Sequence, residues 1–275
     1  MRRLALVLAL GGCFDFDGLS KEFNSAGDGG GTDGGGNPDG QGCVTATGQV
    51  QVPGGTFRMG CVTGDTTCNA DESPAHMVTV SGFTIDRVEV TQREYNTCVA
   101  ASMCAVPSCG IWDPLQTPDL PVECVSWASA KNFCTFAGGR LPTEAEWEMA
   151  ARGPNGATNE FPWGNAPPDC MWVNYAACPQ TQGIWKPTSC MNASPFGALD
   201  MSGNVAEWVN DWYNAAYYAS SPAANPMGPG TGSARVVRGG SLNSVVSEIR
   251  TSARSSLDPT MDMLDIGFRC VNRTR

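Results

Sequence analysis

The residues of this chain that could do the most varied chemistry are its thirteen cysteines. They form no CxxC pair, and His76 is the only histidine, so a structural zinc site is not expected. With Cys13 set aside, the remaining twelve are even in number and widely scattered, which predicts disulfides made in an oxidising compartment and leaves their connectivity open. These twelve are Cys43, Cys61, Cys68, Cys98, Cys104, Cys109, Cys124, Cys134, Cys170, Cys178, Cys190 and Cys270.

A second candidate for chemistry is the short turn from Asp200 to Glu207. A turn with glycine can bring these two carboxylates near the backbone carbonyls of Gly203 and Val205, a set of hard oxygen ligands that calcium prefers. The alternative is that Asp200 caps the turn and Glu207 is solvated or ion-paired. We interpret the turn as a structural calcium site.

The elements that would position these residues are short and mixed. Alternation of apolar and polar residues around a Pro-Gly-Gly turn predicts two strands within 48–61, and a similar pattern continues over 79–90. Helical spacing and capping residues predict helices over 91–101, 126–138 and 142–153. Since the chain holds 33 glycines and 19 prolines, loops should outweigh regular structure, and the predicted fold class is a loop-rich α+β domain.

The N-terminus indicates export. Residues 1–12 have a positive start, an apolar core and small residues before Cys13, and LGGC resembles a bacterial lipoprotein cleavage box. We expect a signal peptide over 1–12, lipidation at Cys13, a flexible Gly/Asp-rich tether over 13–42 and a folded domain over 43–275. An ordinary secretory signal and a mis-chosen start codon are the alternatives.

Charge and hydropathy limit the partners. A net charge of −10 and a pI near 4.5 argue against nucleic acid or an anionic membrane surface. No later segment has the roughly 20 apolar residues of a membrane span, so we expect membrane contact only through the lipid anchor. The predicted location is the cell envelope.

Eight blocks of sequence within about residues 48–272 form a distinctive series: VPGGTFRMG (52–60), FTIDRVEVTQREY (83–95), PVECVSWASAKNFC (121–134), GRLPTEAEWEMAARG (139–153), FPWGN (161–165), LDMSGNVAEWVNDWY (199–213), RVVRGGS (235–241) and IGFRC (266–270). In this order the blocks resemble the domain of the formylglycine-generating enzymes, or sulfatase-modifying factors. That resemblance implies a loop-rich fold related to C-type lectins.

The segment between Arg238 and Cys270 departs from the family pattern. Members that perform the oxidation carry two cysteines there, which bind copper and convert a substrate cysteine to formylglycine. This chain has no cysteine between the two ends of the segment, and the nearest candidates are Ser244 and Ser247. A hydroxyl cannot replace a thiolate as a Cu(I) ligand, so copper is not expected. Ser241, Ser244 and Ser247 become candidates for the cleft.

The resemblance implies further site residues. Matching positions support calcium at Asp200 to Glu207 and a weaker second calcium site at Asn174, whose expected downstream aspartate is missing. Cys134 and Cys270 match positions that form a disulfide in the family, the alternative being two buried thiols. The iron-dependent sulfoxide synthases of the wider family use three histidines, which a chain with one histidine cannot supply.

We therefore hypothesise an envelope lipoprotein of this family without cysteine-oxidase activity. It would act as a binding or assembly module whose cleft takes an extended peptide, a glycan or an envelope protein. The alternatives are an active sulfatase-maturation oxidoreductase that recruits other cysteines, and another envelope maturation enzyme on the same scaffold.

Overall fold

The computed structural model describes residues 48–109, 112–154, 158–179 and 192–274, which belong to one contact unit. The expected signal peptide, Cys13, the tether and the boundary at 43 lie outside the described residues, as do Cys43 and Cys190. None of the helices in the described ranges is long and apolar enough to cross a membrane.

The first part of the domain is built from two antiparallel strand pairs. Strand β1 (Gln49–Val52) pairs with β4 (Phe83–Asp86), and β2 (Gly55–Met59) pairs with β3 (His76–Val80). The alternation that predicted strands within 48–61 is confirmed, because β2 turns Phe57 and Met59 into the core. The strand predicted over 79–90 is divided in the structure. Strand β3 ends at Val80, Ser81 and Gly82 interrupt the strand pattern, and β4 ends at Asp86.

Three helices begin where their capping residues predicted. Helix α1 (Gln92–Ala100), α2 (Trp127–Phe136) and α3 (Glu144–Arg152) each start after a serine or threonine that accepts a hydrogen bond from a first-turn backbone N–H. Thr143 and Glu146 form the full capping box, and α3 ends at Gly153, which has a φ of 87°.

The second part of the domain is a four-stranded sheet in the order β7-β6-β5-β8. It comprises β5 (Ala206–Trp212), β6 (Arg235–Arg238), β7 (Ser255–Leu257) and β8 (Ile266–Phe268). Strand β8 runs parallel to β5, and the other pairings are antiparallel. The described residues also form three short 3-10 helices, which are η2 (Ala70–Glu72), between β2 and β3, η4 (Tyr217–Ala219) and η5 (Val246–Glu248).

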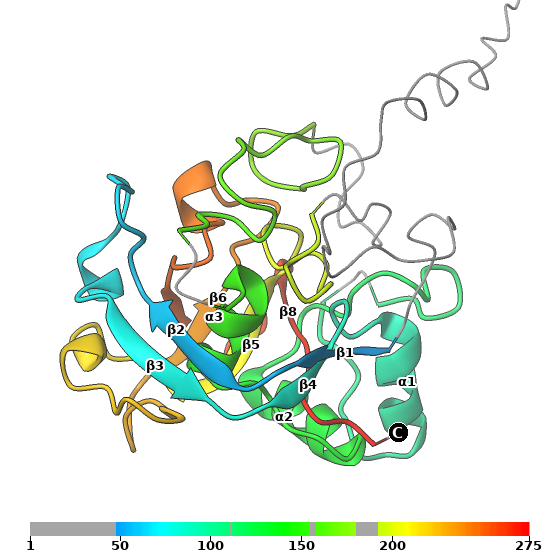
Figure 1. The fold of residues 1–275 in the computed structure, drawn as a ribbon. Coiled ribbons are helices and arrows are strands. Elements are labelled where there is room, and N and C mark those ends of the chain that lie inside the picture. Colours follow the sequence, from blue (N-terminus) through cyan, green and yellow to red (C-terminus); the bar gives the residue numbers. More distant parts are fainter. Residues whose placement is uncertain (1–47, 110–111, 155–157, 180–191, 275) are drawn as a thin grey trace, which may run out of the picture. The chain divides into compact units, whose positions relative to one another are not determined.

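Helix α3 is the centre of the domain. It contacts β2 and β3 on one side and β5 and β6 on the other, so that it lies between the β2–β3 strand pair and the four-stranded sheet (Figure 1). All nine of its residues are buried, charged ones included. A helix enclosed in this way needs partners for its acidic side chains inside the protein.

Disulfides bind the loops together. All ten cysteines within the described residues are paired, and the longest link joins Cys134 in α2 to Cys270 after β8, the pair that the family resemblance implied. The pairings that the sequence left open are Cys61–Cys68, Cys98–Cys104, Cys109–Cys124 and Cys170–Cys178.

Candidate functional site

Buried arginines position the segment that follows β6. Arg238 donates to Glu148 at 2.6 Å, and Arg254 donates to both carboxylate oxygens of Glu144 at 2.7 and 3.0 Å. Both carboxylates come from α3, so the central helix holds the segment through charge as well as packing. The guanidinium groups of Arg238 and Arg254 are therefore engaged inside the protein.

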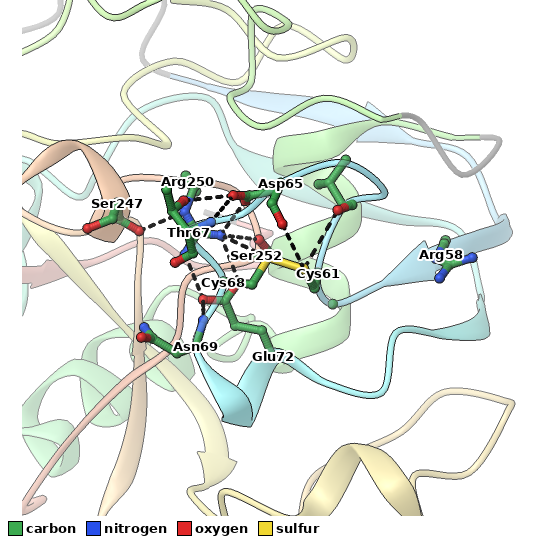
Figure 2. The surroundings of a disulfide bond; sticks show 12 residues. Arg58, Cys61, Asp65, Thr67, Cys68, Asn69, Glu72, Ser247, Arg250 and Ser252 are labelled. Carbon is green, nitrogen blue, oxygen red and sulfur yellow. Dashed lines mark hydrogen bonds and ion pairs between the residues drawn. A yellow bond between two sulfur atoms is a disulfide. The ribbon is translucent and has the colours of Figure 1, made fainter.

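A third arginine, Arg250, joins the Cys61–Cys68 loop to the segment that follows β6 (Figure 2). Arg250 donates to Glu72 at 2.7 and 2.8 Å and to Asp65 at 2.8 Å, beside the Cys61–Cys68 disulfide. Burial raises the pKa of Glu72, but the hydrogen bonds from Arg250, the Asn69 N–H and Ser252, together with the Arg250 charge, outweigh burial and leave that pKa lowered. The disulfide loop is therefore tied to residues 247–252.

A cavity of about 280 Å³ lies among these segments, between the turn after β6 and the start of β8. Ser241 and Ser244 line it, as the cleft prediction expected, together with Glu248, Met263 and Asp265. Ser247 is not among the lining residues, and its carbonyl oxygen accepts a hydrogen bond from Arg250 at 2.8 Å. Its expected place in the cleft is therefore corrected to a structural one.

The turn after β6 presents Ser241 to the cavity. Gly239 and Gly240 have φ values of 86° and 65°, and a Cβ at Gly240 would lie 2.9 Å from the carbonyl oxygen of Glu248. Beyond this turn the Ser241 hydroxyl donates to Asp265 at 2.8 Å, and the Asn243 amide donates to the same carboxylate oxygen at 3.1 Å. Two loops are thus joined across the cavity by one carboxylate.

Glu123 is a buried acidic residue near the cavity residue Asp265 that the sequence analysis missed. It is 4% exposed, and neither of its carboxylate oxygens has a hydrogen-bond partner among the described residues. Burial, with the nearby charge of Asp265, raises the pKa of Glu123 to about 8. The available signal was a lone glutamate between the apolar residues of PVECVSW.

The expected calcium turn contains an incompletely satisfied acidic cluster. Asp200 Oδ1 accepts from the amide of Asn192 at 2.6 Å, whereas Asp200 Oδ2, Asn192 Oδ1 and one oxygen of Glu89 are buried without a hydrogen-bond partner in the described residues. Burial raises the pKa of Asp200 to about 6, and burial together with the Asp200 charge raises that of Glu89. Such oxygens fit the ligand preference of a hard cation, and Gly203 and Val205, whose carbonyls were expected to be ligands, lie in the same turn.

Glu207 has an ion-pair partner inside the protein. Its carboxylate accepts three hydrogen bonds from Arg269, at 2.7 to 3.0 Å, and one from the indole of Trp147 at 2.8 Å. Glu207 is therefore the buried counter-ion of Arg269, and its expected role as a calcium ligand stays a prediction. Within the described ranges, no three His, Cys, Asp or Glu side chains are grouped to hold a metal, so amide and carbonyl oxygens would have to complete the set.

The second expected calcium site remains a prediction. Asn174 is buried, and its backbone carbonyl accepts from the N–H of Asn204 at 2.8 Å, next to the first cluster. The downstream segment that would complete this site, 180–191, lies outside the described residues.

Comparison with known proteins identifies the family. Residues 37–274 match the model of the sulfatase-modifying factor enzyme 1-like domain, and the chain belongs to this family. The formylglycine-generating enzyme of Streptomyces coelicolor is 33% identical in an alignment that covers 82% of this chain and 89% of that protein. The hercynine oxygenase of Mycolicibacterium smegmatis is 30% identical in an alignment that covers 84% of this chain and 62% of that protein.

Solved structures agree on the fold. The structure of PvdO from Pseudomonas aeruginosa superimposes with a TM-score of 0.68 at 25% identity, covering 82% of this chain and 94% of that one. The predicted fold class, a mixed α and β domain with few helices and short strands, is therefore confirmed. The relatives include enzymes of the oxidoreductase type, and the question for this chain is what its own cavity can do.

Proposed function

We propose that this chain is a binding or assembly module of the formylglycine-generating-enzyme family that does not oxidise cysteine. The observation that carries the proposal is the lining of the cavity, which includes Ser241 and Ser244 and no cysteine among its described residues. The ten described cysteines are also all paired, which argues against recruitment of a thiolate from elsewhere in the described domain. The single thioether of Met263, without a thiolate beside it, does not supply a two-cysteine copper site.

The proposed occupant of the cavity is an extended peptide, a glycan or an envelope protein. Five disulfides support residence in an oxidising compartment, in keeping with export and a lipid anchor at Cys13. Fatty-acid labelling in a bacterial host tests the anchor, and labelling that persists in Cys13→Ser would contradict it.

Copper binding tests the proposal for the cavity. A Cu(I) titration against a competing chromophoric chelator is expected to show no copper transfer to the folded chain, because hard hydroxyls do not retain the soft ion. The formylglycine-generating enzyme of Streptomyces coelicolor serves as the control under the same conditions. Stoichiometric Cu(I) retention by this chain, lost in Ser244→Ala, would contradict the proposal.

We also propose a structural calcium ion at the Asp200 turn, held by Asp200 and the carbonyls of Gly203 and Val205, with Glu89 and Asn192 adjacent. The ion would neutralise a carboxylate pair and pin the turn ahead of β5. Calcium at 100 times its Kd should then stabilise the chain by about 2.7 kcal/mol, raising the melting temperature. Asp200→Ala should abolish the increase, and an equal increase in that variant would refute the site.

The alternative function is an envelope maturation enzyme, because two relatives of this chain are a formylglycine-generating enzyme and a hercynine oxygenase. For the formylglycine reaction the alternative needs a reactive thiolate, and for chemistry of the three-histidine kind it needs ligands beyond His76. Neither group is present in the described cavity lining. The binding role is therefore the function that the geometry supports best.

A further inference from the structure

The Cys61–Cys68 disulfide differs in its surroundings from the other disulfides of the described domain. Both of its cysteines are partly exposed. Each of the other four described disulfides has at least one buried cysteine, and these are at most 4% exposed: Cys98, Cys124, Cys134, Cys178 and Cys270. A thiol must reach a sulfur atom to open a disulfide, so among these five an external thiol reaches Cys61–Cys68 most readily.

The loop that this disulfide closes is short and polar. It follows β2 with the sequence CVTGDTTC, and its two cysteines are 7 residues apart. Thr63 and Gly64 at its tip are exposed, and a Cβ at Gly64 would meet no atom within 4 Å. The tip therefore faces open space, where a second polypeptide can approach.

The two sulfurs have opposite electrostatic surroundings. Arg250 Nη1 donates to the sulfur of Cys68 at 3.6 Å (Figure 2). The sulfur of Cys61 instead lies 3.6 and 4.0 Å from the carbonyl oxygens of Val62 and Asp65. An N–H donor stabilises negative charge on sulfur, whereas carbonyl oxygens repel it. Cys68 is therefore the better leaving group of the pair.

The other partners of Arg250 hold the loop in place. Its N–H groups donate to the carboxylates of Asp65 and Glu72 at 2.7 to 2.8 Å, and to the Thr67 carbonyl oxygen at 3.2 Å. The two carboxylates share the charge of Arg250 and so limit its effect on Cys68. The same contacts keep the loop folded when the disulfide opens, and two thiols that stay close together can re-form their bond.

We propose that Cys61–Cys68 is a thiol–disulfide exchange site that accepts two electrons from a dithiol of a second polypeptide. One thiolate of that dithiol attacks the Cys61 sulfur, the bond between Cys61 and Cys68 breaks, and Cys68 leaves as a thiolate beside Arg250. The second thiolate of the partner then attacks the mixed disulfide and releases Cys61. The partner is left with a disulfide, and its two protons pass through solvent to the two cysteine sulfurs.

The exchange site is separate from the cavity. Neither Cys61 nor Cys68 lines the cavity, although the next residue, Asn69, does. Exchange at this loop therefore adds no thiolate to the cavity lining, and its failure would leave the proposed binding function untouched.

Graded reduction of the folded chain tests the exchange site. The disulfide-intact chain is incubated with dithiothreitol, quenched with an alkylating agent and mapped by peptide mass spectrometry. Cys61–Cys68 is expected to open about tenfold faster than the Cys98–Cys104 control, since Cys98 is fully buried. The control closes a loop of similar size, 6 residues. Equal or slower opening of Cys61–Cys68 would overturn the inference.

A monothiol identifies the leaving sulfur without any substitution. Glutathione is added to the folded chain, and the released thiol is alkylated at once so that the mixed disulfide is trapped. The glutathione adduct is expected on Cys61 and the alkyl group on Cys68, because Arg250 stabilises the charge on Cys68. An equal or larger glutathione adduct on Cys68 would contradict the proposed step.

Paired variants check the electron count and the reversibility. In the fast phase, Cys61→Ala with Cys68→Ala should oxidise one equivalent less dithiothreitol than the native chain, whereas Cys98→Ala with Cys104→Ala should oxidise as much as the native chain. After the reductant is removed, oxidised glutathione should close Cys61–Cys68 again in the native chain. Equal oxidation by the two double variants, or a native loop that stays open, would refute the exchange site.

Discussion

Replacing Arg269 by methionine is expected to destabilise the domain by about 3 to 5 kcal/mol, because it leaves a buried carboxylate without its cation. Arg269 is fully buried and donates to both oxygens of Glu207. It also donates to the carbonyl oxygens of Asp86, Arg87 and Leu199, at 3.0 to 3.2 Å, and so ties β8 to the end of β4 and to the Asp200 turn. Glu89 and Asp200 lie near the same charge.

Urea denaturation measures this loss, and two further variants check its cause. Arg93→Met removes an ion pair whose side chains are 63% and 55% exposed, and it should cost less than about 1 kcal/mol. Arg269→Met combined with Glu207→Leu should recover part of the loss, since the orphaned carboxylate is then absent. An Arg269→Met midpoint equal to the native one would contradict this account of the pair.

Loss of the Cys134–Cys270 disulfide is expected to cost about 5 kcal/mol in the chain-entropy model, since it closes a loop of 136 residues. The paired sulfurs lie in the core cluster that contains Phe133 and Phe268. This link holds α2 against the end of the chain just after Arg269, so its removal should also loosen the packing around Glu207.

The matched control is the Cys98–Cys104 disulfide, which closes a loop of only 6 residues. Double alanine substitution there should cost about 2 kcal/mol, and the same change at Cys134 and Cys270 about 3 kcal/mol more. Thermal and urea unfolding under non-reducing conditions measure both. Equal losses in the two variants would contradict the long-loop explanation.

Local signals in the sequence were sufficient for the helices. Thr143, Glu146 and Gly153 specify the start and end of α3 within a dozen residues, and strand alternation likewise placed Phe57 in the core. Such features depend on neighbours along the chain. The fold class followed from them and from the family blocks.

The candidate site depends on partners that are distant in the sequence. Arg250 and Glu72 are 178 residues apart, and no local pattern predicts that they meet. Glu207 had two possible partners, a calcium ion and a buried arginine, and only the placement of β8 beside β5 brings Arg269 to it. Glu123 likewise owes its raised pKa to burial and to the charge of Asp265, which is distant in the sequence. Among the described disulfides, Cys134–Cys270 is non-local in the same way, whereas the other four join cysteines 6 to 15 residues apart.

We propose above that this member of the family does not oxidise cysteine. The most direct test incubates the purified chain with a CxPxR peptide, Cu(I) and oxygen, and measures the aldehyde by mass spectrometry beside the Streptomyces coelicolor enzyme. The account predicts unmodified peptide with this chain and formylglycine with the control. Conversion of the peptide by this chain, at any rate above the copper-only blank, would contradict it.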